Sequence, residues 1–293
     1  MPLVPTSSIV DAASAARVGA AAFNVIHLET AEALVTAAER TGIPLILQIS
    51  ENCIRYHGSL RPLTHATLAL AEESTARIAV HLDHITDPEL VHQGITAGVG
   101  SVMVDASALP YEENVATTAE LTAWCHERGA YVEAELGEIG GKDGVHAPGV
   151  RTNPDDALAF VRATGVDALA VAVGSSHAMQ ERTAVLDKEL IAALRSTLPV
   201  PLVLHGSSGV PDDELRRAIA AGMTKINIST HLVSVFTHSI RQTLDADPAL
   251  VDSRKYIKPA RAAVAEEAAR LLDVLGTPAA VPGQYAAQAP ARG

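Results

Sequence analysis

Eight short runs of aliphatic and β-branched residues recur along this chain of 293 residues, and amphipathic stretches separate them. These stretches carry helix signals: DPELVHQGITAGVG opens on Asp-Pro, and NPDDALAFVRATG opens on Asn-Pro and ends at glycine. Strands that alternate with helices pair in parallel, and eight such units are the number that closes a (β/α)8 barrel. The expected strands span residues 21–26, 44–50, 77–83, 101–107, 131–137, 168–174, 201–207 and 225–230.

An open, doubly wound α/β sheet is the rival architecture. Such a sheet typically carries G-x-G-x-x-G after its first strand, and the residues after AAFNVI contain no such motif. Several of the expected strands are continuously apolar, which is typical of strands buried on both faces. The sequence therefore predicts an α/β fold of the (β/α)8 TIM-barrel type.

A single domain is expected over residues 1–275. A short helix before residue 21 should close the bottom of the barrel, and C-terminal helices are expected at 231–247 and 253–275. Residues 276–293 are rich in alanine, proline and glycine, a composition that predicts a disordered tail.

Composition narrows the classes of function. The net charge of −12 argues against a nucleic-acid-binding protein, which would show a basic patch. No apolar stretch approaches the roughly 20 residues that span a bilayer, and the N-terminus lacks the pattern of a signal peptide. A cytoplasmic protein without a membrane or nucleic-acid partner is expected. Cys53 and Cys125 are too few for a disulfide framework and should be free thiols, with Cys125 in the core.

Polar side chains gather at the carboxyl ends of the expected strands, where a barrel of this type places its chemistry. Histidine, carboxylate, hydroxyl and amide groups therefore converge on one face, which predicts a site there. In strand order these residues are Asn24, Ser50, Asp83, His84, Asp105, Glu135, His177, His205 and the segment 227–230.

The stretch VHLDHITDP places three of these polar groups within four positions. Side chains alternate along a strand, so His81 and Asp83 share one face and His84 points the other way. Asp83 and His84 reach one pocket only if the regular strand ends between them. His81 is deeper and is expected to be a hydrogen-bonded residue of the barrel.

Three histidines at strand or loop ends, namely His84, His177 and His205, match the three nitrogen ligands of a catalytic zinc with one open position. The alternative is three ordinary loop histidines, because the chain has twelve histidines and no HExxH motif. Spacing alone leaves both interpretations open.

Seven motifs carry a family resemblance: FNVI, HLDH, VDAS, EAELGEIGG, VGSSH, LHGSSGVP and KINIST. In this order, at successive strand ends from about residue 20 to 275, they resemble the motifs of class II, zinc-dependent ketose-bisphosphate aldolases. That group includes the fructose-bisphosphate and tagatose-bisphosphate aldolases. The resemblance implies a barrel, a carbon–carbon lyase, a phosphorylated ketose as substrate, and a homo-oligomer, dimer or tetramer.

By that resemblance His84, His177 and His205 bind zinc, and Asp83 is the acid/base on the substrate hydroxyl beside the bond that breaks. A divalent metal stabilises negative charge as a Lewis acid, and a neighbouring carboxylate can take and return the hydroxyl proton. Asp105 and Glu135 match positions that hold a second or alternative metal in some relatives. The other interpretation is that they orient the zinc ligands from behind. The expected cofactor is Zn²⁺, with a second divalent metal or a monovalent cation as an additional occupant.

Phosphate binding is expected in the loops after strands seven and eight, where GSSG and NIST supply backbone N–H groups and hydroxyls. Arg254 resembles an arginine that relatives contribute to the far phosphate, sometimes from a neighbouring subunit; an exposed surface charge is the alternative. The expected contacts to substrate or phosphate are Asn24, Ser50, Ala178, Gly206, Ser207, Ser208, Asn227, Ile228, Ser229 and Thr230.

A lysine Schiff base is the competing aldolase chemistry. Among five lysines, Lys225 begins the eighth strand and should lie at the barrel bottom, away from the site. Only Lys142, on the loop after strand five, could approach the pocket, and in water it would stay protonated. The lysine mechanism is therefore disfavoured.

Three departures from the family pattern put the sugar in doubt. The loop after strand five reads GGKDGV where relatives often have consecutive glutamates. If one of those glutamates abstracts the ketose proton, Glu138 or Asp143 must replace it here, or the task falls to a residue elsewhere. Ala178 stands where glycine is usual, and Ser229 stands where the fructose enzymes often have aspartate. A non-catalytic sugar-phosphate binder and a metal-dependent hydrolase are the alternatives; GSSG and NIST argue against the hydrolase.

Overall fold

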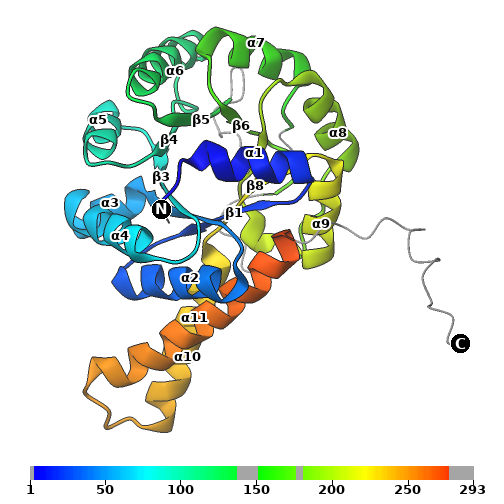
Figure 1. Ribbon diagram of the computed structural model, residues 1–293. Coiled ribbons are helices and arrows are strands. Elements are labelled where there is room, and N and C mark those ends of the chain that lie inside the picture. The colour runs from blue at the N-terminus through cyan, green and yellow to red at the C-terminus, as the bar shows by residue number, and fades with distance from the viewer. Residues whose placement is uncertain (1–2, 137–150, 176–180, 277–293) are drawn as a thin grey trace, which may run out of the picture.

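The computed structural model describes residues 3–136, 151–175 and 181–276. Its eight parallel strands close into a barrel in sequence order, with β8 paired to β1 (Figure 1). The predicted (β/α)8 architecture is confirmed. The strands are β1 Ala20–Asn24, β2 Leu45–Ser50, β3 Ile78–Ile85, β4 Ser101–Val104, β5 Tyr131–Glu135, β6 Ala168–Ala170, β7 Leu202–Leu204 and β8 Met223–Ile228.

Helices surround the barrel, and their ends obey the predicted signals. Asp87 caps one helix and Asn153 another, and each is followed by a proline in the first helical turn. Gly42 and Gly165 end two helices in the left-handed conformation, which glycine adopts at little cost. The helices are α1 Thr6–Ala16, α2 Leu28–Thr41, α3 Glu51–His57, α4 Arg61–Glu73, α5 Pro88–Thr96, α6 Tyr111–His126, α7 Pro154–Thr164, α8 Lys188–Thr197, α9 Asp212–Ala221, α10 Thr230–Ala246 and α11 Ser253–Gly276, with a 3-10 turn η1 at Ser207–Gly209.

The lower interior of the barrel is apolar and is closed by α1, as expected. Ile9 and Val10 of α1 pack against Ala22 and Ile46 of the first two strands. In Figure 1 this helix lies across the end of the barrel. Burial of these side chains seals the end opposite the strand termini that carry the polar residues.

A helical arm formed by α10 and α11 extends away from the barrel (Figure 1). Leu232 is the one buried residue of α10, whereas α11 returns along α2 and is buried on one side. Arg40 of α2 forms an ion pair with Glu266 of α11, with 2.8 Å between nitrogen and oxygen. The expected C-terminal helices are therefore present, and residues 277–293, most of the expected tail, lie outside the described part of the chain.

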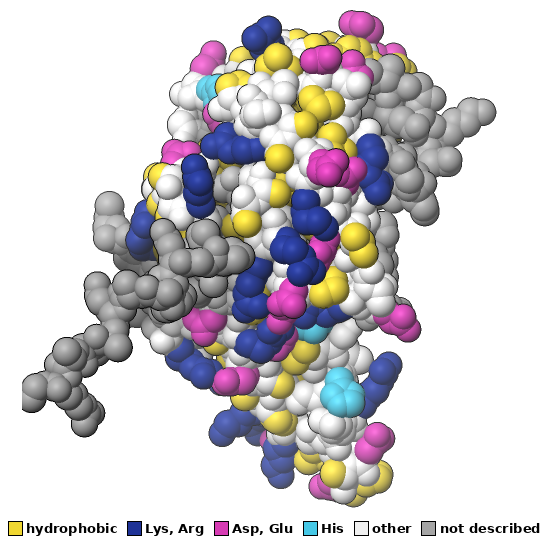
Figure 2. Space-filling model, turned by 90° about the vertical axis from the view of Figure 1, so that its right-hand side faces the viewer, with side chains coloured by type: hydrophobic (Ala, Val, Ile, Leu, Met, Phe, Trp, Pro, Cys, Tyr) yellow, Lys and Arg dark blue, Asp and Glu magenta, His cyan; other side chains and the backbone are white. Residues whose placement is uncertain are grey.

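The face that Figure 2 presents, over α8, α9 and the end of α11, interleaves basic and acidic side chains. Ion pairs link these helices: Lys188 lies 2.8 Å from Glu214, and Arg270 pairs with Asp212. None of the helices in the described part of the chain combines the length and apolar character that crossing a bilayer requires.

Candidate active site

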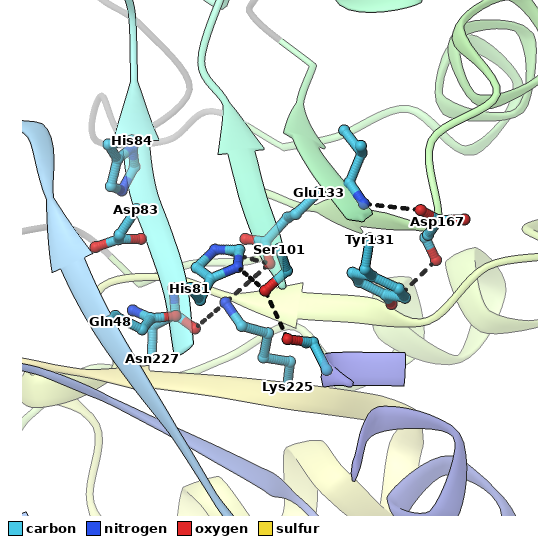
Figure 3. Close-up of polar contacts among 12 residues, drawn as sticks. Gln48, His81, Asp83, His84, Ser101, Tyr131, Glu133, Asp167, Lys225 and Asn227 are labelled. Carbon is cyan, nitrogen blue, oxygen red and sulfur yellow. Dashed lines mark hydrogen bonds and ion pairs between the residues drawn. The ribbon is translucent and has the colours of Figure 1, made fainter. Parts of the chain in front are cut away.

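A bulge in β3 brings Asp83 and His84 to the same side. His84 has φ 51°, a left-handed conformation that is uncommon outside glycine, and the register between β3 and β4 shifts between Leu82 and Ile85. The strand itself runs on to Ile85, so the alternation is broken by a bulge rather than by the end of the strand. Figure 3 shows His81, Asp83 and His84 in succession along β3.

Asp83 is buried and held from one side. Asn24 at the end of β1 donates from Nδ2 to Oδ2 of Asp83 at 2.8 Å, and Gln48 of β2 donates to Oδ1 of Asn24 at 3.3 Å. Oδ1 of Asp83 is buried and makes no hydrogen bond within the described residues. Two amides thus fix the carboxylate and leave one oxygen to accept a proton or a ligand.

The rings of His84 and His205 face each other across the top of the barrel. Nδ1–H of His84 donates to Asp105 at 2.8 Å, and Nε2–H of His205 donates to Glu133 at 2.9 Å. The two remaining ring nitrogens, Nε2 of His84 and Nδ1 of His205, lie 2.9 Å apart. Because both rings use their outer nitrogens as donors to carboxylates, their inner nitrogens can act as acceptors for a proton or as ligands for a metal ion.

Carboxylates give this position a negative potential. Burial lowers the pKa of His84, but the charges of Asp83, Asp105 and Glu135 outweigh burial and raise it to about 9. Burial raises the pKa of Asp105, but its bonds from His84 and Ser107 hold that pKa well below its usual range. The site therefore favours a positive charge between the two histidines.

The donor set fits a divalent cation. Ligand atoms of Asp83, His84 and His205 lie within 4.8 Å of one another, and so do those of His84, Asp105 and Glu135. Imidazole nitrogen and carboxylate oxygen are the ligands that divalent metals such as zinc bind. His177, the third expected histidine, lies outside the described residues.

The loop after β7 turns sharply beside this cluster. Gly206 has φ 68° and leads into η1, where Ser207 donates from Oγ to the carbonyl of Leu204 at 3.0 Å. Oγ of Ser208 accepts the N–H groups of Ser229 and His231, each at 3.2 Å. Ser208 therefore joins this loop to the start of α10 and keeps its own hydroxyl hydrogen to donate.

Lys225 does not lie where the sequence placed it. Its side chain is fully buried inside the barrel, with Nζ 2.8 Å from Oε2 of Glu133 and 2.9 Å from Oδ1 of Asn227. The expectation of a lysine at the barrel bottom is wrong, because the long side chain extends upward to the layer below His205. A buried, paired amine still cannot reach a substrate carbonyl, so the argument against a Schiff base holds for Lys225.

The sequence model of a family described as fructose-bisphosphate aldolase class-II matches residues 4–279 of the chain. The chain belongs to this family. Class-II aldolases are metal-dependent lyases that cleave a ketose bisphosphate, and the carboxylate–histidine cluster at the barrel mouth provides candidate metal ligands. A phosphorylated sugar as substrate follows from membership of the family.

Relatives of the aldolase family match over nearly their whole length. The fructose-bisphosphate aldolase of Geobacillus stearothermophilus is 38% identical over 268 residues, 90% of this chain and 93% of that protein. The probable fructose-bisphosphate aldolase of Bacillus subtilis (strain 168) is 39% identical over 270 residues, covering 91% and 95%. The crystal structure of the YdjI aldolase from Escherichia coli K12 superposes with a TM-score of 0.82 at 31% identity, covering 94% of this chain and 97% of that one.

The cluster at the barrel mouth brings together six of the residues that the sequence singled out. Asn24 bonds to Asp83, and Asp105 bonds to His84. His205 lies 2.9 Å from His84, and Glu135 shares a donor set with His84 and Asp105. The expected residues Ala178, Glu138, Lys142 and Asp143 lie outside the described residues.

Four other residues make none of the hydrogen bonds described within this cluster, although Ser50 is in register with Asp83 on the neighbouring strand. Ser50 accepts the N–H of Cys53 at 3.2 Å and so caps α3. Both cysteines are free and buried, and burial raises the pKa of the Cys53 thiol to about 11, so it stays protonated at neutral pH. Arg254 lies exposed at the start of α11, paired with Asp252 at 2.9 Å.

Sequence reasoning missed Gln48 and Glu133. Gln48 interrupts the apolar run PLILQIS, and Glu133 lies two positions before Glu135 and so points the same way. A polar residue at an inward-facing position of an apolar strand was the available signal.

Proposed function

We propose that this chain is a zinc-dependent aldolase that reversibly cleaves a ketose bisphosphate, of fructose- or tagatose-1,6-bisphosphate type, to dihydroxyacetone phosphate and an aldehyde phosphate. The observation that carries the proposal is the pair of imidazoles whose inner nitrogens lie 2.9 Å apart beside an unbonded oxygen of Asp83. His84 and His205, together with His177, would hold the zinc. When bound, the metal supplies a Lewis acid that stabilises the negative charge left on the three-carbon ketose fragment.

Asp83 takes the proton of the substrate hydroxyl next to the bond that breaks and returns it in the condensation direction. Its Oδ2 is occupied by Asn24, so Oδ1 is the atom that accepts the proton. Burial of Asp83 excludes bulk water from this transfer. A proton-transfer group positioned in this way typically contributes about 10²–10⁴-fold to the rate.

The phosphate of the three-carbon fragment binds between the loop after β7 and the start of α10. Backbone N–H groups at a turn and at a helix N-terminus favour an anion. Ser208 supports this assignment, because it holds the two segments together at hydrogen-bond distance. The residues proposed for this contact are Ala178, Gly206, Ser207, Ser208, Asn227, Ile228, Ser229 and Thr230, while Asn24 and Ser50 face the aldehyde half.

Asp105 and Glu135 are proposed to support the zinc site, by orienting a zinc ligand or by binding an additional cation. Asp105 orients His84 through its 2.8 Å hydrogen bond, as carboxylates do for metal-binding histidines. Glu135 shares a compact donor set with both residues, which suits a second divalent metal or a monovalent cation. Abstraction of the ketose proton is assigned to Glu138 or Asp143 on the loop after β5.

The active form of the protein is proposed to be a homo-oligomer, either a dimer or a tetramer. Arg254 is exposed on the arm, away from the cluster at the barrel mouth, and in an oligomer it would serve the far phosphate of a neighbouring site. Sedimentation of the native chain checks the oligomeric state.

The metal assignment is tested by removing either the ion or a ligand. Dialysis of the wild type against a chelator should abolish cleavage of fructose and tagatose 1,6-bisphosphates, and added zinc should restore it. The variant His205→Ala should also lose this activity, and added zinc should not restore it. The matched control is His126→Ala, which removes another carboxylate-bonded histidine, 2.9 Å from Asp167 and outside the cluster. Full turnover in the chelated protein would contradict the proposal.

A non-catalytic sugar-phosphate binder is the second candidate, favoured by the altered loop after β5. Incubation of zinc-loaded protein with dihydroxyacetone phosphate distinguishes the aldolase from the non-catalytic binder. Exchange of the ketose proton with solvent supports the aldolase, and tight binding without exchange supports the binder.

A further inference from the structure

Inside the barrel, one layer below the proposed metal site, lies a buried pair of opposite charges. Glu133 of β5 and Lys225 of β8 are both fully buried, and Nζ of Lys225 is 2.8 Å from Oε2 of Glu133 (Figure 3). Their neighbours in the strand register are apolar: Met103 and Ala168 flank Glu133, and Val203 is beside Lys225. A charge in such surroundings is unfavourable unless it is paired.

Each partner also contacts the layer above. Oε1 of Glu133 accepts Nε2–H of His205 at 2.9 Å, and Nζ of Lys225 donates to Oδ1 of Asn227 at 2.9 Å. Nδ2 of Asn227 lies 3.2 Å from Nε2 of His205. The pair therefore makes its polar contacts with the residues that surround one histidine.

His81, in the layer below, approaches Glu133 without forming a hydrogen bond to it. His81 lies 4.0 Å from Oε2 of Glu133 through Nε2, and its Nδ1 is 2.9 Å from Oγ of Ser101. Oγ of Ser101 is in turn 2.6 Å from Oγ1 of Thr6 in α1. A short chain of hydrogen-bonded groups thus runs from α1 to His81, which lies beside the glutamate.

Stability alone does not account for such a pair. Apolar side chains of similar volume usually stabilise an interior as well as a buried ion pair does, or better. A role that requires the charge explains it, because metal-binding histidines commonly donate their other ring N–H to a carboxylate.

We propose that Glu133 and Lys225 act together as the positioning device for His205. Glu133 accepts the Nε2–H of His205, which commits Nδ1 to the metal and fixes the plane of the ring toward His84. Lys225 lies 2.8 Å from Oε2 of Glu133 and compensates its charge inside the barrel. This inference rests on the proposed metal site, and neither residue contacts the substrate.

The test is a double variant, Glu133→Gln with Lys225→Met, which removes both charges and keeps side chains of similar size and an acceptor for His205. The zinc dissociation constant is measured by competition with a chromophoric chelator, and the visible spectrum of the cobalt-substituted protein reports ligand geometry. Zinc should bind roughly 10–100-fold more weakly, the usual effect of losing such a partner, and the cobalt spectrum should change. Thermal unfolding of the metal-free double variant should stay near that of the wild type.

The single variant Lys225→Met should be less stable than the double variant, because it leaves Glu133 as an unpaired buried charge. The matched control is Glu214→Gln with Lys188→Met, which neutralises an ion pair of the same 2.8 Å length between α8 and α9. Zinc affinity should be unchanged in this control. If the Glu133 and Lys225 double variant does not fold, Glu133→Asp, which keeps both charges but shortens the reach of the carboxylate to His205, gives the comparison of zinc affinity and cobalt spectrum instead.

Two failures are distinguishable. If the wild type binds zinc no better than His205→Ala, the proposed metal site is wrong. If the wild type binds zinc and the Glu133 and Lys225 double variant binds it equally well with an unchanged cobalt spectrum, only the positioning role is overturned. An equal loss of affinity in the Glu214 and Lys188 control would also overturn that role.

Discussion

The conformation of a single residue brings His84 to the same side of the barrel as Asp83. Regular alternation along β3 would point His84 away from the interior that Asp83 faces. The left-handed φ of 51° at His84 reverses that direction, and Asp105 holds the ring through its Nδ1. Strain of this kind persists where the surrounding structure over-determines it, as here.

Asp83→Ala tests the division of labour between neighbouring residues. We expect the variant to fold and to retain zinc, because His84 and His205 keep their carboxylate partners, and to lose about 10²–10⁴-fold in turnover. The measurement is kcat at saturating zinc together with metal content by elemental analysis. Loss of zinc in parallel with turnover would mean that Asp83 is a ligand or a structural residue.

The residues at the strand ends could be predicted from the sequence, but their conformations and depth could not. Asp83, His84 and His205 were placed at one end of the barrel because strand order alone brings them there. The bulge at His84 depends on the register between β3 and β4, which no local pattern specifies. The sequence placed Lys225 at the barrel bottom because its backbone lies near the start of β8. Its side chain is long enough to reach Glu133 in the next layer of the interior.

At the scale of elements, Glu214 joins α8 to α9. It lies in the first turn of α9, accepts the N–H of Leu186 at 2.8 Å and pairs with Lys188 and Arg217. Burial raises its pKa, but these partners outweigh burial and lower the pKa to about 2. Glu214 thus anchors the segment that leads into α8 to α9, the helix that follows the β7 loop.

This anchor predicts a pH dependence of stability. A carboxyl group with a lower pKa in the folded state stabilises the fold fully above its unfolded pKa, here 4.5, and loses that effect as the pH falls through about 2. The free energy of unfolding of wild type should therefore exceed that of Glu214→Gln by a constant amount above pH 4.5, and the difference should shrink toward pH 2. Urea titrations of both proteins across this range measure it. A difference that stays constant down to pH 2 would show that the charge of Glu214 is not what matters.

At the scale of the whole molecule, barrel closure turns distant segments into one site. His84 and His205 are 121 positions apart in the chain, yet their ring nitrogens are 2.9 Å apart. The alternation of strands and helices predicted this convergence, since parallel strands of a closed barrel end on the same face. The pairing of the β7 loop with α10 through Ser208 could not be predicted, because it depends on how two loops pack.

The last prediction concerns which ketose binds where these distant segments meet. Dihydroxyacetone phosphate should bind far better than dihydroxyacetone, because the β7 loop and the start of α10 present donors to an anion. Ser208→Ala should remove about 10–100-fold of that preference, the equivalent of one hydrogen bond to a charged group. Ser207→Ala is the matched control: its hydroxyl already donates to the carbonyl of Leu204, so Ser207 would contact the phosphate only through its backbone N–H, which alanine keeps, and the preference should change little. Competition binding on zinc-loaded protein measures both ketoses in each variant. If the two ketoses bind alike to the wild type, these loops do not hold the phosphate, and the site serves a different carbonyl substrate.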